Sequence, residues 1–285
     1  MTFPARGAYM KLNHRSLLLA ALVLTVVLVV PGCITLDGGG IGTTTTETFE
    51  ETYPVTVGAC LDVQNRNGSI TIVPADGDSI VVRAVKHTNY GRSEFDKVRI
   101  DVTAGDPFTV VTTVLREPAR VSIDYELRVP RSMLVRTAVT TNGSIEATGV
   151  RGTMELHTSN GSVKVENIDG AVRATTTNGN VTLHKVAAVT GATTTNGVVE
   201  CQVAALDGTA VDVHTTNGNL ILWVAPDLPA TLEASTTNGN LVMDDITLDN
   251  ATASKHSIRG DLGVPKGTLS AQTTNGNLTV HRLNP

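Results

Sequence analysis

An Asn-Gly pair returns at nearly fixed spacing through the second half of this 285-residue chain. Each pair follows a Thr- and Ser-rich segment and precedes alternating apolar residues, with steps of 18, 18, 18, 21, 21, 21 and 16 residues. The seventh member is degenerate, with Arg259-Gly260 in place of Asn-Gly. Such regular spacing indicates a repeat architecture. The other pairs, expected to be structural turns, are Asn142, Gly143, Asn160, Gly161, Asn178, Gly179, Asn196, Gly197, Asn217, Gly218, Asn238, Gly239, Asn275 and Gly276.

Residues at a fixed offset from the turn Asn share one chemical character. The third and fifth residues after it are always apolar. This alternation, which also precedes the turn, predicts a strand on each side. Both turn residues suit positive φ, which Gly adopts freely and Asn with little strain. The second residue before the Asn always carries a hydroxyl group: Thr140, Thr158, Thr176, Thr194, Thr215, Thr236, Ser257 and Thr273.

Two β architectures use such turns: antiparallel hairpins in a meander or sandwich, and the stacked coils of a β-solenoid. Columns of Thr and Asn favour the solenoid, because parallel in-register stacking rewards side-chain ladders. Outward charges agree, since Glu155 with Arg173 and Glu146 with Lys164 would be neighbours in adjacent coils. We therefore predict an all-β protein, a right-handed β-solenoid (β-helix) of 18–21-residue coils with an irregular N-terminal β cap.

The composition agrees with a β protein and limits the partners. Aromatic residues make up 3% of the chain and charged residues 17%, whereas Thr, Val and Gly are abundant. The net charge is −5 and there is no basic block. Because phosphate binding needs clustered Lys and Arg, we expect no nucleic-acid partner.

The N-terminus predicts export and lipidation. Lys11, His14 and Arg15 precede an uncharged apolar run, Ser16 to Val30, that is shorter than the ~20 residues of a membrane-spanning helix. A small residue directly before Cys33 resembles the lipobox of prokaryotic lipoproteins, which makes Cys33 the lipidated first residue of the mature protein. The alternatives are an uncleaved anchor helix and a secreted protein with an incidental Cys33. All three place the folded part outside the cytoplasm.

These features predict four parts: a signal peptide (1–33), a flexible tether (34–52), an irregular β cap (53–131) and β-solenoid repeats (132–285). The tether has too few apolar groups to offset the entropy of ordering. The cap contains one coil-like turn at Asn67-Gly68, strand pairs around residues 76–78 and 104–107, and a strand over 121–129. At the other end, Leu278 and Val280 are expected in the last, barely capped edge, with Pro285 and Arg282 blunting it.

No catalytic, metal or cofactor site is predicted. His157, His214 and His256 share an offset, but coils that far apart separate them by about 10–14 Å, beyond a shared ion. Cys201 occupies an inward column distant from Cys60, so a disulfide bridge between them is not expected. The acidic segment 244–250 lacks the spacing of a calcium loop and is interpreted as a solvated turn.

The residues resemble a known family. The segments "LDVQNRNGSITI", "FDKVRIDV" and "YELRVPRSMLVRTAVTTNGSIEATGV", followed by "TTNGNL" blocks, are similar to the putative adhesin family of β-strand repeat proteins, DUF4097, from about Leu61 to Val280. The resemblance implies an extracytoplasmic β-helix, often lipid-anchored or membrane-tethered. It implies no enzymatic activity and supplies no catalytic residues.

Three functional hypotheses follow. The first is a non-enzymatic cell-envelope lipoprotein, an adhesin-like binding or scaffold module that is attached to the membrane by its lipid and binds a surface polymer or an envelope protein. The second is an envelope-stress or signalling accessory protein that docks on a membrane partner. The third is a polysaccharide lyase or hydrolase, which requires closely spaced carboxylates and aromatic platforms. Glu146, Glu155, Glu200, Asp212 and Glu233 are instead scattered among columns, and Trp223 is the single indole.

Overall fold

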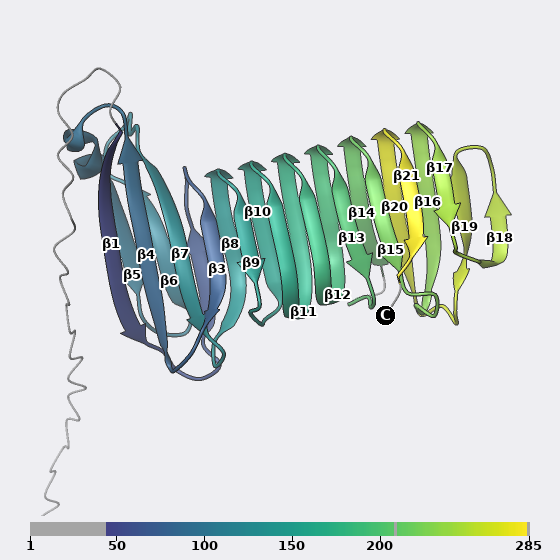
Figure 1. The fold of residues 1–285 in the computed structure, drawn as a ribbon, viewed down its shortest axis with the longest axis horizontal. Coiled ribbons are helices and arrows are strands. Elements are labelled where there is room, and N and C mark those ends of the chain that lie inside the picture. The colour runs from purple at the N-terminus through teal and green to yellow at the C-terminus, as the bar shows by residue number, and fades with distance from the viewer. Residues whose placement is uncertain (1–43, 208–209, 284–285) are drawn as a thin grey trace, which may run out of the picture. The chain divides into compact units, whose positions relative to one another are not determined.

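The computed structural model describes residues 44–207 and 210–283 (Figure 1). These residues form 21 strands and one short 3₁₀ helix, η1 (Arg92–Lys97), so the described part of the chain is all-β, as predicted. Within it, no helix is long and apolar enough to cross a membrane. The predicted signal peptide with Cys33, and residues 34–43 of the predicted tether, lie outside the described residues.

The strands alternate between buried and exposed residues, and their buried side chains form one hydrophobic core. In chain order they are β1 (Thr45–Pro54), β2 (Cys60–Gln64), β3 (Ile70–Ala75), β4 (Ser79–Thr88), β5 (Val98–Thr103), β6 (Phe108–Val114), β7 (Ser122–Pro130), β8 (Leu134–Asn142), β9 (Ile145–Thr148), β10 (Met154–Asn160), β11 (Val163–Asn178), β12 (Val181–Asn196), β13 (Val199–Val203), β14 (Ala210–Asn217), β15 (Leu220–Val224), β16 (Ala230–Asn238), β17 (Leu241–Asp244), β18 (Asp249–Ala253), β19 (Ser257–Leu262), β20 (Gly267–Asn275) and β21 (Leu278–Arg282).

Hydrogen bonding arranges these strands in two rows. The first row contains the strands that precede the turns, with antiparallel strands at its ends, in the order β5, β6, β2, β8, β10, the second part of β11, the second part of β12, β14, β20, β16, β19 and β18. The second row contains the strands that follow the turns, with two antiparallel strands, β1 and β4, at one end. Its order is β1, β4, β7, β3, β9, the first part of β11, the first part of β12, β13, β15, β21 and β17.

A coil consists of one first-row strand, a turn and one second-row strand, and neighbouring coils pair in parallel. The register places each turn Asn beside the next, as in Asn160 with Asn178 and Asn178 with Asn196. The column pattern therefore predicted the in-register parallel stacking correctly. The boundary expected at 131/132 falls in the loop between β7 and β8. Parallel pairing continues across it, because β2 pairs with β8 and β3 with β9.

The coils do not stack in sequence order at either end of the array. Coil β2–β3 lies between coils β6–β7 and β8–β9. Coil β20–β21 lies between coils β14–β15 and β16–β17, where its yellow strands are visible in Figure 1. The prediction that Leu278 and Val280 form the last edge is wrong, since both side chains are 0% exposed. The turn residues of this coil match a neighbour on either side, which allows it to lie inside the array.

The degenerate unit at Arg259-Gly260 is not a turn. Both residues lie within β19, which pairs antiparallel with β16 and, on its other side, with β18. The hairpin β18–β19 therefore covers the outer edge of β16. Because Arg259 lacks the side-chain amide that a turn Asn offers its neighbours, this segment does not extend the Asn column, and the seventh repeat of the sequence is a cap.

The predicted tether is also too long. Residues 45–52 belong to β1, which pairs antiparallel with β4 from Thr45 opposite Thr88 to Pro54 opposite Ser79. The physical reason is that Phe49 and Tyr53 lie on the same face of the strand and pack against the core. The other strands expected in the cap, on both sides of residues 76–78 and 104–107 and over 121–129, are confirmed as β3 to β7.

Candidate binding surface

The turn asparagines form a side-chain ladder along the array. Each Nδ2 donates to the Oδ1 of the Asn in the neighbouring coil, at 2.7–2.9 Å. Asn67 of coil β2–β3 belongs to the same ladder. None of these asparagines has a positive φ, so the expected conformation is wrong for Asn, and its place in the turn is explained by the ladder. The order is Asn238, Asn275, Asn217, Asn196, Asn178, Asn160, Asn142 and Asn67.

The turn glycines are required by close approach of neighbouring coils. A Cβ added at Gly179 would lie 2.0 Å from the carbonyl oxygen of Gly161, and one at Gly276 would lie 2.0 Å from that of Gly218. The buried Thr two residues before each turn Asn donates its hydroxyl to one of these carbonyl oxygens, as Thr176 does to Gly161 at 2.8 Å. The predicted turn residues are thus brought together as bonded columns, with no sign of a ligand site.

One of the two predicted charge pairs forms. Lys164 Nζ lies 3.2 Å from Glu146 Oε1 in the neighbouring coil. Glu155 and Arg173 are neighbours in register, as predicted, but the Arg173 guanidinium donates instead to the carbonyl oxygen of Thr190 at 2.9 Å. Long Arg side chains reach backbone acceptors as well as carboxylates, so register alone did not fix this partner.

Trp223 is not an open platform for a sugar ring. The His281 ring stacks on the indole with 5.5 Å between ring centroids, and His184 approaches edge-to-face at 6.1 Å. Glu200 contacts Nε2 of His184 and Asp244 contacts Nδ1 of His281, both at 2.9 Å. His281 thus covers one face of the indole. The rings of His184, Trp223 and His281 form a cross-strand stack that stabilises neighbouring coils.

A trough on the outer side of the second row is the best candidate binding surface. Its volume is about 430 Å³, and it lies over β3, β7 and β4, which are adjacent in that order. Hydroxyl, carboxylate, guanidinium and imidazole groups line it beside one apolar side chain. The lining residues are Ser69, Thr71, Arg83, Val85, His87, Asp124, Tyr125 and Glu126.

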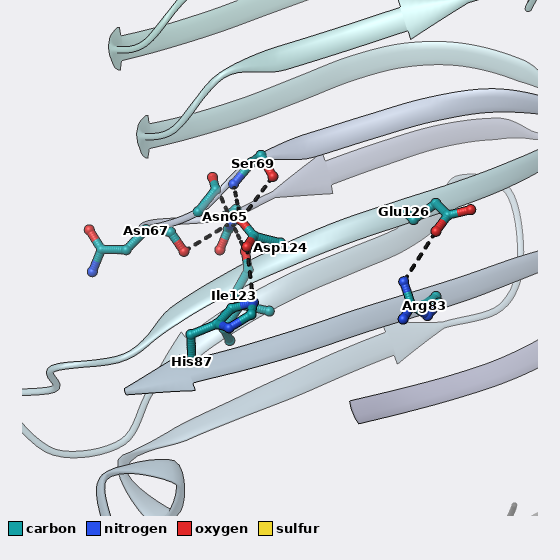
Figure 2. A network of polar contacts seen from close by, with 9 residues as sticks. Asn65, Asn67, Ser69, Arg83, His87, Ile123, Asp124 and Glu126 are labelled. Atoms are coloured by element: carbon teal, nitrogen blue, oxygen red, sulfur yellow. Dashed lines mark hydrogen bonds and ion pairs between the residues drawn. The ribbon is translucent and has the colours of Figure 1, made fainter. Parts of the chain in front are cut away.

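Buried Asn65 fixes the side of the trough that is formed by β3 and β7. Its Nδ2 donates to the carbonyl oxygens of Ile123, Gly68 and Asn67 at 2.7, 3.1 and 3.3 Å. These bonds attach the turn before β3 to the start of β7, as Figure 2 shows. As a result, Ser69 lies directly beside Asp124.

Asp124 links both banks of the trough. Its Oδ1 accepts hydrogen bonds from the backbone N–H and the hydroxyl of Ser69, at 2.7 and 2.8 Å. Its Oδ2 lies 3.1 Å from Nε2 of His87 on β4 (Figure 2). In a hydrolytic triad the imidazole lies between serine and carboxylate, so that it takes the serine proton. Here the carboxylate lies between them, and the Ser69 hydroxyl is not activated by His87.

The other end of the trough is held by charge pairs. Arg83 Nη1 lies 3.3 Å from Glu126 Oε2, and Nε lies 3.5 Å from Glu50 Oε2. Arg128 and, to a smaller extent, Arg83 hold the pKa of Glu126 below its ordinary value, so this carboxylate is ionised at neutral pH. Burial raises the pKa of Tyr125 to about 12, and its neutral phenol contacts the Thr112 hydroxyl at 2.8 Å.

The trough was missed in the sequence because no motif marks it. Its polar residues come from three strands that are separated along the chain and become neighbours only through the parallel β3–β7 and antiparallel β4–β7 pairings. The one sequence signal that could have indicated the trough is that polar residues occupy the alternate, outward-facing positions of each strand. The described residues contain no group of three or more His, Cys, Asp or Glu that could hold a metal ion. Cys60 and Cys201 are free, and burial raises the pKa of Cys201 to about 12.

The stacked turn ladder and the matching sequence pattern point to one family. The family model described as Toastrack DUF4097 matches residues 61–281. The chain belongs to the Toastrack DUF4097 family. The matched range runs from β2 to β21, so it includes the trough and both coils that stack out of sequence order.

Solved structures with distant similarity are named as adhesion or binding proteins. A putative adhesin from Bacteroides fragilis is 11% identical with a TM-score of 0.44, and the alignment covers 83% of this chain and 97% of that one. A putative lipid binding protein from Parabacteroides distasonis is 10% identical with a TM-score of 0.38, covering 85% and 98%. A putative cell adhesion protein from Clostridium sporogenes is 8% identical with a TM-score of 0.28, covering 83% and 100%. Comparison with curated proteins found no match.

Proposed function

We propose that this Toastrack protein is a non-enzymatic cell-envelope lipoprotein, an adhesin-like binding or scaffold module displayed outside the cytoplasm. In this proposal Cys33 carries the lipid, and the parallel coils form a right-handed β-solenoid. The hand follows from the rule that parallel crossover connections within one sheet are right-handed in about 98% of cases. The export pattern before Cys33 and the family membership support this proposal.

The observation that carries the binding role is the geometry of the trough. Its Asp124 carboxylate is shared between Ser69 and His87, and Arg83 lies between two carboxylates. Such groups are fixed in place before a ligand arrives, which lowers the entropy that binding must overcome. Fixed carboxylate, guanidinium and hydroxyl groups suit the alternating donors and acceptors of a hydroxyl-rich ligand. A neutral surface polysaccharide is the ligand class that fits best.

The test measures retention of the full-length protein on immobilised neutral polysaccharides, for wild type and two Arg variants. Arg83→Ala removes the guanidinium from the trough. Arg99→Ala is the matched control, because Arg99 also pairs with a carboxylate, Asp101, but lies on β5 in the other row. We expect at least about fivefold weaker retention for Arg83→Ala only. No retention of wild type, or equal loss in both variants, would reject the trough as the binding site.

The anchor is tested separately. Intact mass and membrane partition are measured for the protein expressed with its N-terminal segment, beside a Cys33→Ala version. The proposal requires a lipid mass on a chain that begins at Cys33, and loss of both the lipid and membrane retention in the variant. Release of both versions without modification would contradict lipid anchoring and would leave the binding role to be judged from the trough alone.

A further inference from the structure

Each coil presents the same hydrogen-bonding groups to the coil that follows it in the stack. In the coils with an Asn-Gly turn, they are the N–H and C=O of the turn Gly, the N–H of the third residue after the turn Asn, and the side-chain oxygen of the turn Asn. The residue two positions after the Asn adds a further side-chain oxygen in every such coil but one, where it is Val198. Between coils β14–β15 and β20–β21 these bonds measure 2.8–3.0 Å. They join Gly218 to Asn275 and Thr273, Leu220 to Asn277, Asn217 to Asn275, and Asn219 to Asn277.

Coil β16–β17 is the last in the stack, and its equivalent groups have no partner within the described part of the chain. These groups are the N–H and C=O of Gly239, the N–H of Leu241, and the Oδ1 atoms of Asn238 and Asn240. Leu278 donates to the carbonyl oxygen of Asn240 at 2.9 Å, so the alternation of a parallel pair turns the N–H of Leu241 away from β21. The outer edge of β17 is therefore an open hydrogen-bonding template.

The side chains on this edge are also less covered than their equivalents. The second-row strand β15 shows full burial at every second residue, whereas β17 has partly buried Leu241 and Met243 and an exposed Val242. The hairpin β18–β19 covers only the first-row strand β16. The hairpin ends beside the free edge, where the His256 carbonyl oxygen accepts from Thr236 N–H at 2.9 Å and the buried His256 Nδ1 has no partner.

We propose that the free edge of β17 binds an extended segment of a partner protein that runs parallel to β17 and carries the pattern Asn-Gly-Asn-apolar-x-apolar followed by basic residues. Strand addition to a sheet edge is a common mode of peptide recognition. The chain itself provides the precedent, because β21, reached through the hairpin, occupies the equivalent position on the inner side of β17. A segment with this pattern would supply a hydrogen-bonding partner for each open group of coil β16–β17, as coil β20–β21 does for coil β14–β15.

Charge favours a basic partner over a second copy of this chain. Asp244 and Asp245 lie at the end of the free edge and are exposed, and His281 of β21 already approaches Asp244 at 2.9 Å from the inner side. A segment with His or Arg after its apolar residues repeats that contact. A second copy whose β17 ran parallel to this one and in register would bring the two Asp pairs together, which is destabilising.

The probe is a fluorescent peptide with the sequence of Thr273–Leu283, TTNGNLTVHRL, which fits the proposed pattern. Its anisotropy is measured with full-length protein, against a scrambled peptide. Asn240→Ala removes one open acceptor whose side chain has no other described partner. Asn219→Ala is the matched control, since its Oδ1 accepts from Asn277 N–H at 2.9 Å inside the stack. We expect Asn240→Ala to weaken peptide binding at least about fivefold with unchanged Tm, and Asn219→Ala to lower Tm with unchanged binding.

Three results would overturn the proposal. The first is equal binding of the scrambled peptide, and the second is loss of peptide binding in Asn219→Ala as large as in Asn240→Ala. The third is a protein dimer in sedimentation that Asn240→Ala dissociates, which would make a second copy the occupant. None of these results bears on the trough, which lies over β3, β7 and β4 at the other end of the second row. The proposed function and this inference therefore fail independently.

Discussion

The two ends of the coil stack are closed differently. At the end that carries coil β6–β7, antiparallel strands cover both rows: β5 pairs with β6, and β4 pairs with β7 and is itself covered by β1. At the end that carries coil β16–β17, the hairpin β18–β19 covers only the first row. The second row ends on β17, with open hydrogen-bonding groups and partly covered side chains. Antiparallel strands thus close three of the four row ends, and no described strand pairs with the outer edge of the fourth, β17.

The two ends also share a feature that sequence order hides. The first coil of the chain, β2–β3, and the last, β20–β21, each lie one layer inside the stack, between two other coils. Terminal coils at an edge would fray, because they would gain contacts on one side only. Placement inside the stack gives each of these two coils a neighbour on both sides. The coils at the ends of the stack are instead β6–β7 and β16–β17, which the chain holds at both of their ends.

The largest expected effect comes from filling the turn of the inserted coil. A Cβ at Gly276 would lie 2.0 Å from the backbone oxygen of Gly218, so Gly276→Ala must push two coils apart. We expect a loss of about 4 kcal/mol or more in the free energy of unfolding, measured with denaturant. Gly77→Ala is the control, because no atom lies within 4 Å of the added Cβ and only its positive φ of 89° opposes the change. Its loss should be about 1–2 kcal/mol.

Equal losses in Gly276→Ala and Gly77→Ala would contradict the close packing of turn on turn.

A Leu→Ala substitution compared between the two ends of the stack gives the next largest effect. Leu127 on β7 is 0% exposed beneath the antiparallel cover, whereas Leu241 on β17 is partly buried at the open edge. Leu127→Ala should lower the free energy of unfolding by about 3–4 kcal/mol, and Leu241→Ala by about 1 kcal/mol. A similar loss at both positions in denaturant titrations would mean that β17 is covered.

The Asn ladder sharpens the comparison between interior and edge. Asn275 both donates to Asn217 and accepts from Asn238, while Asn238 only donates. Since a hydrogen bond contributes about 0.5–1.5 kcal/mol net, Asn275→Ala should cost about 1–2 kcal/mol and Asn238→Ala about half of that. Thermal unfolding of both variants measures the ratio. A larger loss at Asn238 would place that residue inside the stack.

The smallest effect is a pH dependence at the closed end. Arg136 on β8 holds the pKa of Asp62 on β2 below its ordinary value of 3.8. The stability from this lowered pKa is present above pH 3.8 and is lost as the pH falls through the folded-state value. Asp62→Asn should lower the free energy of unfolding by less than about 1 kcal/mol at pH 7. It should also flatten the fall in stability between pH 4 and pH 2, and an unchanged slope would rule out this origin.

The amino-acid sequence predicted the stacking register because the column of turn Asn residues is interrupted only at Arg259. Hydroxyl, Asn and apolar positions recur at the same offsets, and in-register stacking is the arrangement that uses them all. The order of the last coils could not be predicted in this way. The coil of Asn275 has the same kinds of residue at the column positions as the coil of Asn238, so either coil can stack on the coil of Asn217. Arg259 and the final 16-residue step indicate where the repeat pattern is broken, but they do not predict the hairpin β18–β19 that forms there.

The trough could not be predicted because it depends on contacts between distant segments. Ser69, His87 and Asp124 are unremarkable outward residues in the sequence, and only the pairing of β7 with both β3 and β4 joins them. The tether was predicted too long for a related reason. Phe49 and Tyr53 are too few to indicate a strand by themselves, and they become a strand face once β4 offers a partner.

The insertion of coil β20–β21 is tested most directly by disulfide trapping in the full-length protein. Thr279 lies in register beside both Ile221 and Val242, so it separates these two residues. Adjacent strands are about 4.8 Å apart, within disulfide range, and strands two apart are not. The Ile221→Cys, Thr279→Cys pair should therefore form a bridge, and the Ile221→Cys, Val242→Cys pair should not. A bridge in the second pair and none in the first would show that the coils stack in sequence order and that β17 is not the open edge.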